Sequence, residues 1–120
     1  FINPAFVEKA VAEHPSVDDV FVWGIATEAN APGEKEVVAA IVPRAPGEFD
    51  PQAVFDHCKE VLEANFIPAF IQVLTEIPKT ASEKPQERFC FEAFTATPQS
   101  VHPRIYFKGY VNAWHNAPRR

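Results

Sequence analysis

Two lysines five residues apart, Lys79 and Lys84, stand in a short polar segment that follows an apolar run at residues 70–74. The apolar run predicts a strand, and Pro78 stops it. Pro85 can open a helix, because its missing N–H costs nothing at the first helical position. The pattern predicts a strand that ends in a loop with a cation at its tip. A lysine placed there is a movable positive charge, suited to a phosphate or a developing oxyanion.

The tripeptide Pro78-Lys79-Thr80, followed after three residues by Lys84, resembles the last core motif of the adenylate-forming (AMP-binding) enzymes. That motif usually reads P-[KR]-T-x-x-G-K, and the family includes acyl-CoA synthetases, peptide-synthetase adenylation domains and luciferases. Residues 2–89 as a whole resemble the C-terminal domain of an acyl-CoA synthetase. They look closest to the carnitine/crotonobetaine-CoA ligase branch of that family.

The resemblance implies that Lys84 is the catalytic residue of an adenylation step. In the family, the lysine at this position enters the active site of a larger N-terminal domain and contacts the carboxylate substrate and the α-phosphate oxygens. Carboxylate attack on a phosphate brings like charges together, and a lysine between them neutralises both. The resemblance makes Lys79 a lesser candidate for binding a phosphate or CoA, whereas its residue type favours a plain surface lysine.

One position departs from the motif, because Glu83 stands where the family usually has glycine. Glycine permits a positive φ and a close backbone approach, which glutamate does not do freely. The Glu83 charge could also pair with Lys84 while the loop is idle. This departure supports an alternative function, a catalytically inactive stand-alone binding module that has kept the fold.

The resemblance implies a two-step reaction of an ATP-dependent acyl-CoA ligase. A carboxylic acid and ATP give acyl-AMP and pyrophosphate, and the CoA thiol then displaces AMP. The substrates and cofactors would be ATP, CoA and Mg²⁺, the Mg²⁺ arriving with ATP and held mainly by an N-terminal adenylation domain, which is the expected partner. The identity of the acid stays open. A peptide-synthetase subdomain is a third possibility, for which a downstream carrier domain would be needed.

Composition sets broad limits on these functions. The chain has 120 residues, 47% of them hydrophobic, which is enough for one globular domain. No apolar run approaches the roughly 18–20 residues of a membrane span. A net charge of −5 does not favour nucleic acid as a partner. The chain starts without Met or a signal peptide, so we expect a fragment of a longer protein, and its two expected free thiols favour a cytoplasmic location.

Helix signals occur at three places in the chain. Asn3 as N-cap and Pro4 as first residue predict a helix over residues 4–13, which the proline after His14 ends. Asp50 and the following proline start a second helix that we expect to end near Asn65. The expected buried positions of this second helix are Val54, Phe55, Cys58, Val61 and Leu62. A short helix after Lys84 would carry Phe89 and Phe91 or Phe94.

Three strands are expected, at residues 17–25, 36–42 and 70–77. The short connection at residues 27–34 is rich in turn residues and favours an antiparallel hairpin between the first two. The predicted fold is therefore α+β, a small mostly antiparallel sheet of about three strands with flanking helices. In the resembling family this unit is the C-terminal lid domain.

Residues 95–120 differ from the rest in composition. All sixteen acids and seven of the bases lie in residues 1–94, whereas the last 26 residues hold four bases and no acid. The tail also holds three prolines and an aromatic cluster of Tyr106, Phe107, Tyr110 and Trp114. We interpret residues 1–94 as the lid domain and residues 95–120 as a Pro/aromatic-rich basic extension.

Histidine and cysteine give no metal prediction. His14 is expected to be a capping or surface residue at a helix end, because a lone His without carboxylates is a poor ligand set for Mg²⁺. Cys58 and Cys90 lie in apolar, helical contexts and are expected to be buried free thiols. No metal site is assigned to this chain.

Overall fold

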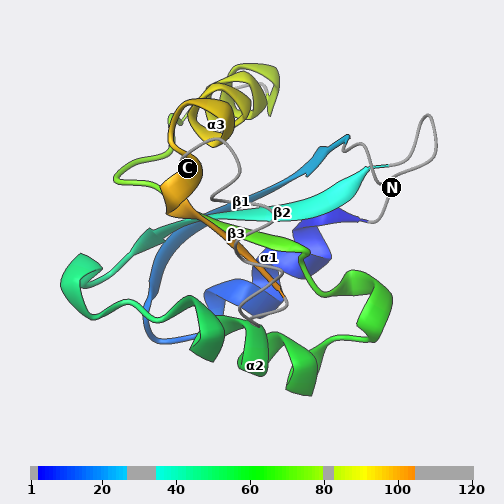
Figure 1. Cartoon of the computed structure of the whole chain (residues 1–120). Coiled ribbons are helices and arrows are strands. Elements are labelled where there is room, and N and C mark those ends of the chain that lie inside the picture. The colour runs from blue at the N-terminus through cyan, green and yellow to red at the C-terminus, as the bar shows by residue number, and fades with distance from the viewer. Residues whose placement is uncertain (1–2, 27–34, 80–82, 105–120) are drawn as a thin grey trace.

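The computed structural model describes most of the chain (Figure 1). The described ranges are 3–26, 35–79 and 83–104, with the side chains of residues 83 and 84 excepted. In these ranges lie three α-helices and four strands: α1 (Pro4–Ala12), β1 (Val17–Ile25), β2 (Glu36–Pro43), α2 (Pro51–Val61), β3 (Phe70–Val73), α3 (Glu83–Ala96) and β4 (Val101–Pro103). The predictions for the hairpin loop at 27–34, residues 80–82 and the aromatic cluster at 106–114 fall outside them.

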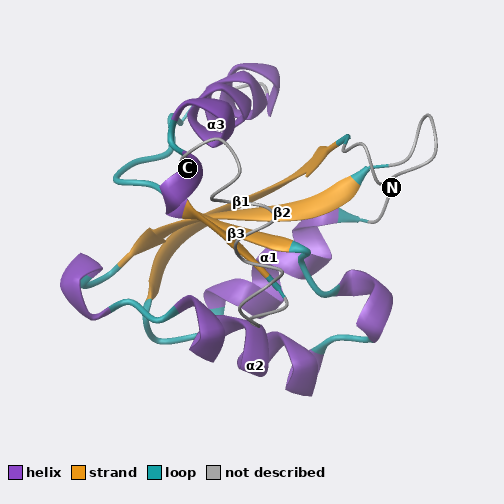
Figure 2. Cartoon of the chain, viewed as in Figure 1, coloured by secondary structure: helices purple, strands orange, loops and turns teal. Residues whose placement is uncertain are grey.

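One mixed sheet forms the middle layer, with strand order β1-β2-β3-β4. β1 and β2 pair antiparallel, β2 and β3 parallel, and β3 and β4 antiparallel. α1 and α2 lie on one face of the sheet and α3 on the other, as Figure 2 shows. The predicted α+β fold and antiparallel hairpin are confirmed. The described residues contain no helix long and apolar enough to cross a membrane.

The first two helices start where their capping residues predict. The Asn3 side chain accepts a hydrogen bond from the backbone N–H of Ala5 at 3.0 Å, and Asp50 accepts one from Gln52 at 3.0 Å. In both helices a proline occupies the first turn, where no N–H is needed. α2 ends earlier than predicted, because Leu62 turns to extended backbone.

Both faces of the sheet are buried, as the apolar runs predict. Along β2, Val37 and Ile41 pack against α1 and α2, whereas Val38 and Ala40 pack under α3. This alternation follows from the two-residue period of a strand. One predicted core residue is wrong: Val61, in the last turn of α2, is 45% exposed.

The third strand is shorter than the predicted 70–77. Leu74 N–H still donates to the Ile41 carbonyl at 2.9 Å, but the next bond of a parallel ladder would need an N–H from Pro43. Proline has none, so pairing stops, and β3 ends at Val73. Ile77 lies beyond the strand and is nevertheless buried in the cluster beneath α3.

The described sheet has one strand more than the predicted three. β4 lies in the segment interpreted as an extension, and Phe70 of β3 pairs with Pro103 of β4. The backbone N–H of Arg104 then donates to the Ala69 carbonyl at 2.8 Å. The sheet therefore continues past residue 94, while the division of the chain at that residue stays a prediction.

The last helix begins earlier and runs longer than predicted. α3 starts at Glu83 and spans 14 residues, so Lys84 lies within its first turn instead of before it. Phe94 and Cys90 are buried against the sheet, whereas Phe89 and Phe91 are 37% and 48% exposed. Of the three phenylalanines that the helix carries, Phe94 therefore belongs to the core.

A buried glutamine fastens α3 to the sheet. Gln72 of β3 is fully buried, and its Oε1 accepts a hydrogen bond from the indole N–H of Trp23 at 3.2 Å. Its Nε2 donates to the Cys90 carbonyl of α3 at 2.8 Å. One side chain thus links β1, β3 and α3 with its polar atoms satisfied, which is the condition for burying an amide.

Replacing Gln72 with methionine should lower the free energy of unfolding by about 1–3 kcal/mol, because the Trp23 indole N–H loses its acceptor inside the core. Urea denaturation of the purified chain measures the effect. Gln99→Met is the matched control, since Gln99 is exposed in the turn after α3 and its change should have little effect. Equal stability of Gln72→Met and the original chain would contradict the fastening role.

Candidate functional site

The predicted catalytic segment connects the sheet to α3. Pro78 and Lys79 precede it, and Lys84 is the second residue of α3. The helix assignment places the backbone of Lys84 in the first turn, where unpaired N–H groups and the helix dipole favour an approaching anion. The side chain of Lys84 lies outside the described residues, so its catalytic role stays a prediction.

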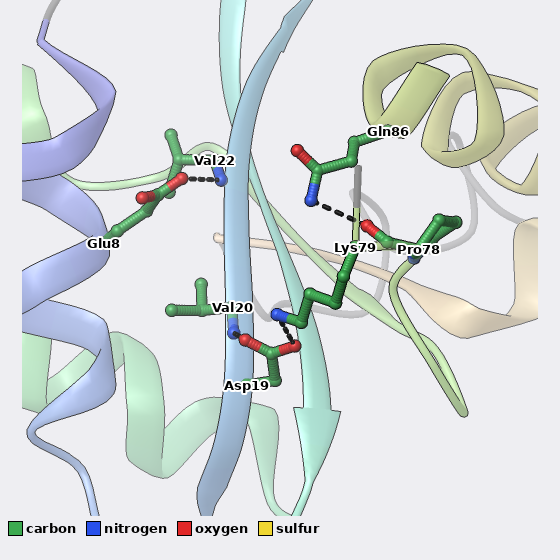
Figure 3. Close-up of polar contacts among 7 residues, drawn as sticks. All are labelled: Glu8, Asp19, Val20, Val22, Pro78, Lys79 and Gln86. Atoms are coloured by element: carbon green, nitrogen blue, oxygen red, sulfur yellow. Dashed lines mark hydrogen bonds and ion pairs between the residues drawn. The ribbon is translucent and has the colours of Figure 1, made fainter. Parts of the chain in front are cut away.

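The other candidate lysine is held by a carboxylate. Lys79 Nζ donates to Asp19 Oδ2 of β1, forming an ion pair in which the lysine side chain is 71% exposed (Figure 3). Asp19 is itself oriented, because its Oδ1 accepts a hydrogen bond from the backbone N–H of Val20 at 2.9 Å. The exposure agrees with a surface lysine. Contact of Lys79 with a phosphate or CoA stays a prediction.

A second contact closes the base of the same segment. Gln86, in α3, donates from Nε2 to the Pro78 carbonyl at 2.7 Å (Figure 3). Asp19 and Gln86 were not identified from the sequence as partners of this segment. Asp19 is sixty residues away from its lysine, and a lone glutamine after a proline carries no signal.

The outer edge of β1 also receives a carboxylate from α1. Glu8 Oε2 accepts a hydrogen bond from the backbone N–H of Val22 at 2.8 Å (Figure 3). Together with the bond from Val20 to Asp19, this gives two N–H groups of β1 a side-chain acceptor. Glu8 therefore helps to fasten α1 to the sheet.

A groove opens beside the far end of β1, under α3. It has a volume of about 520 Å³, and its lining includes Trp23, Ile25, Lys35, Glu87, Arg88 and Phe91. Trp23 and Phe91 meet edge to face with ring centroids 6.3 Å apart. The groove is therefore lined by aromatic side chains on one part of its surface and by charged groups of both signs on another. Sequence analysis missed it, because its lining comes from segments far apart in the chain.

The histidine at the end of α1 has a structural role. His14 Nδ1 accepts hydrogen bonds from the backbone N–H of Ser16 at 3.1 Å and from its hydroxyl at 2.8 Å. The His57 ring of α2 lies edge to face, 5.5 Å away. Burial, and secondarily the nearby His57, lower the pKa of His14 below the ordinary 6.5.

The described part of the chain shows no cluster of metal ligands and no reactive cysteine. There, no group of three or more His, Cys, Asp or Glu side chains could hold a metal ion. Cys58 and Cys90 are buried free thiols, as predicted. Burial raises the pKa of Cys58 to about 11, and burial together with Glu87 raises that of Cys90 to about 12. Both stay protonated near neutral pH and are therefore poor nucleophiles.

The described elements define a small α+β domain with a four-stranded mixed sheet. Residues 7–84 match the model of a protein family described as the AMP-binding enzyme C-terminal domain. The chain belongs to this family, which confirms the family resemblance. Its match includes the segment from Pro78 to Lys84. The carnitine/crotonobetaine branch is not distinguished by this match.

Known relatives include CoA ligases. The chain is 30% identical over 95 residues to a probable CoA ligase, CCL9, of Humulus lupulus, covering 79% of this chain and 18% of that protein. It is 28% identical over 97 residues to oxalate–CoA ligase of Arabidopsis thaliana, covering 81% and 18%. A solved structure of o-succinylbenzoate-CoA synthetase from Bacillus subtilis, with its acyl-adenylate intermediate, aligns with TM-score 0.61 and 31% identity, covering 73% and 17%. The chain thus spans less than a fifth of these proteins' length.

Stability should fall in mild acid partly through His14. Above pH 6.5 the folded and unfolded chains both hold a neutral ring; as the pH drops through 6.5 the unfolded chain gains a proton first, so unfolding becomes easier. His14→Asn keeps an acceptor for Ser16 but cannot titrate. We expect its unfolding free energy to decline less between pH 7.5 and 5.5, as measured by urea denaturation. An equal decline in both proteins would contradict this assignment.

Proposed function

We propose that this chain is the C-terminal lid domain of an ATP-dependent acyl-CoA ligase and supplies Lys84 to the adenylation step. The observation that carries the proposal is that Lys84 ends the family-matched region, lies in the first turn of α3, and follows the Pro78-Lys79-Thr80 tripeptide after three residues. The CoA ligases among the relatives support the same reaction class.

The chemistry needs a positive charge at one point of the first step. A carboxylate oxygen attacks the α-phosphorus of ATP, the bond to pyrophosphate breaks, and acyl-AMP forms. The Lys84 ammonium lies between the carboxylate and the α-phosphate oxygens and stabilises the charge that gathers there. In the second step the CoA thiol attacks the acyl carbon, and AMP leaves with the C–O bonding electrons.

The rest of the domain acts as a rigid carrier for the lysine. Helices cover both faces of the sheet, so the domain can rotate between the two steps as one body about a hinge outside it. In the first pose it offers the Lys84 segment to the adenylation domain; in the second it turns that segment away. The Mg²⁺ that accompanies ATP would be held mainly by the adenylation domain, so no residue of this chain is assigned to it.

Glu83 is compatible with this role. It is the first residue of α3, where the backbone is right-handed and needs no positive φ. An acidic residue in the first turn is also favoured by the helix dipole. The glycine of the usual motif is therefore not required by the backbone of this chain.

Lys84→Ala tests the proposal in the enzyme that joins this domain to its adenylation domain. Pyrophosphate release from acid plus ATP should fall about 100-fold or more, because the transition state loses its countercharge. Thioester formation from CoA and supplied acyl-AMP should survive. Carnitine-like, aryl and medium-chain acids are assayed side by side, because the identity of the acid stays open.

Lys59→Ala is the matched control, since Lys59 is an exposed lysine of α2 paired with Asp56. It should leave both half-reactions unchanged. If Lys84→Ala also leaves both unchanged, the catalytic assignment is wrong, and an inactive binding module becomes the better description.

The 120-residue chain alone should not adenylate an acid. The phosphate-binding loop and the adenine and acyl pockets of the family lie in the N-terminal domain, so Lys84 would have no bound nucleotide to act on. Pyrophosphate release is measured with the purified chain and with its Lys84→Ala variant. Release by the original chain above the variant's level would contradict the lid assignment.

A further inference from the structure

We propose that Asp19 and Gln86 are positioning residues that aim Lys84 during adenylation, an inference that rests on the function proposed above. Each makes a contact at one end of the segment that leads to Lys84. Asp19 pairs with Lys79, at the start of the segment. Gln86, two residues after Lys84, donates a hydrogen bond to the carbonyl of Pro78 (Figure 3). Neither contact reaches the reacting atoms directly.

Gln86 closes the segment at its base. Its Nε2 lies 2.7 Å from the Pro78 carbonyl oxygen, a short hydrogen bond in a partly buried position. The bond joins the last residues after β3 to the first turn of α3. Lys84 stands two residues before Gln86 in that turn, so the bond fixes the place from which its side chain extends.

Asp19 holds Lys79, the last described residue before the segment that leads to α3. The pairing of β1 with β2 shifts between Val17 and Asp19, and such an irregularity re-aims a strand's side chains. One oxygen of Asp19 is held by Val20 N–H, which leaves the other directed at Lys79. The carboxylate is 30% exposed and the lysine 71%, so the contact is accessible to salt.

These contacts give Lys79 a different role from that of a nucleotide ligand. Its ammonium pairs with Asp19, and its place five residues before Lys84 suits a tether for the catalytic lysine. The two anchors come from β1 and α3, and Gln72 links these same elements through the core. Pro78 and Lys79 are therefore attached to elements that the core also holds together.

The expected consequence is confined to one half-reaction. A catalytic group displaced by about 1 Å can lose up to 100-fold in rate, because the reacting atoms must meet in near-attack geometry. Lys84 acts in adenylation, whereas the lid has turned it away during thioester formation. Loss of an anchor should thus lower the turnover of adenylation and spare the second step.

The test uses Gln86→Leu and Asp19→Asn in the enzyme that joins this domain to its adenylation domain. Gln86→Leu removes the hydrogen bond to Pro78, Asp19→Asn removes the negative charge that pairs with Lys79, and both nearly preserve side-chain size. We expect adenylation kcat to fall about tenfold, with an unchanged KM for ATP and unchanged thioester formation from acyl-AMP. Raising the salt concentration should reduce the effect of Asp19→Asn and leave that of Gln86→Leu.

Matched controls are present in the same fold. Gln52→Leu removes a glutamine in the first turn of α2 that donates to Asp56 on the surface. Asp18→Asn removes the neighbouring exposed carboxylate, which pairs with Arg44 at 3.7 Å. Neither control contacts the segment before Lys84, so both should keep full adenylation turnover.

Combining each variant with Lys84→Ala separates positioning from general damage. If Asp19 and Gln86 act through Lys84, neither change should lower adenylation further once that lysine is gone. Undiminished adenylation in the single variants, additive losses with Lys84→Ala, or equal losses in both half-reactions would overturn the inference. If Lys84→Ala itself leaves adenylation intact, the proposed function fails, and the inference fails with it.

Discussion

The Gln72 amide is the interaction on which the architecture depends. It is the one polar or charged side chain that is fully buried among the described residues, and it holds β1, β3 and α3 together. Apolar packing alone lets a helix slide on a sheet, because the hydrophobic effect has no direction. A buried amide with two fixed partners has direction, so it sets the register of α3. The first turn of α3, which contains Lys84, is therefore also positioned on the sheet by this contact.

Local signals in the sequence were enough for most elements. Asn3 and Asp50 cap the first two helices as predicted, and the β-branched runs form β1 and β2. The errors come from constraints that act between elements. β3 ends early because Pro43 on another strand has no N–H to offer, and β4 has three residues, too few for a periodic pattern. Strand pairing of this kind cannot be seen in one segment at a time.

The candidate site likewise contains residues that the sequence alone revealed and residues that it did not. Lys79 and Lys84 were found because their motif is local and resembles that of a family to which the chain belongs. Asp19 and Gln86 could not be found, since an aspartate in a strand and a glutamine in a helix have no distinctive chemistry until the fold brings them to Pro78 and Lys79. The proposed catalytic lysine is thus visible in a local motif, whereas its proposed positioning residues become visible only in the folded structure.

The side-chain acceptors along β1 have a consequence for how this domain meets other proteins. β1 is an edge strand of the described sheet, and open edges invite strand addition and aggregation. Glu8 and Asp19 occupy two of its N–H groups, and β4, at the opposite edge, is short and contains Pro103. Both edges of the described sheet are therefore poorly suited to pairing with a strand from another protein. A shared sheet would hold a rotating lid in one pose, so blunted sheet edges suit the lid role proposed above.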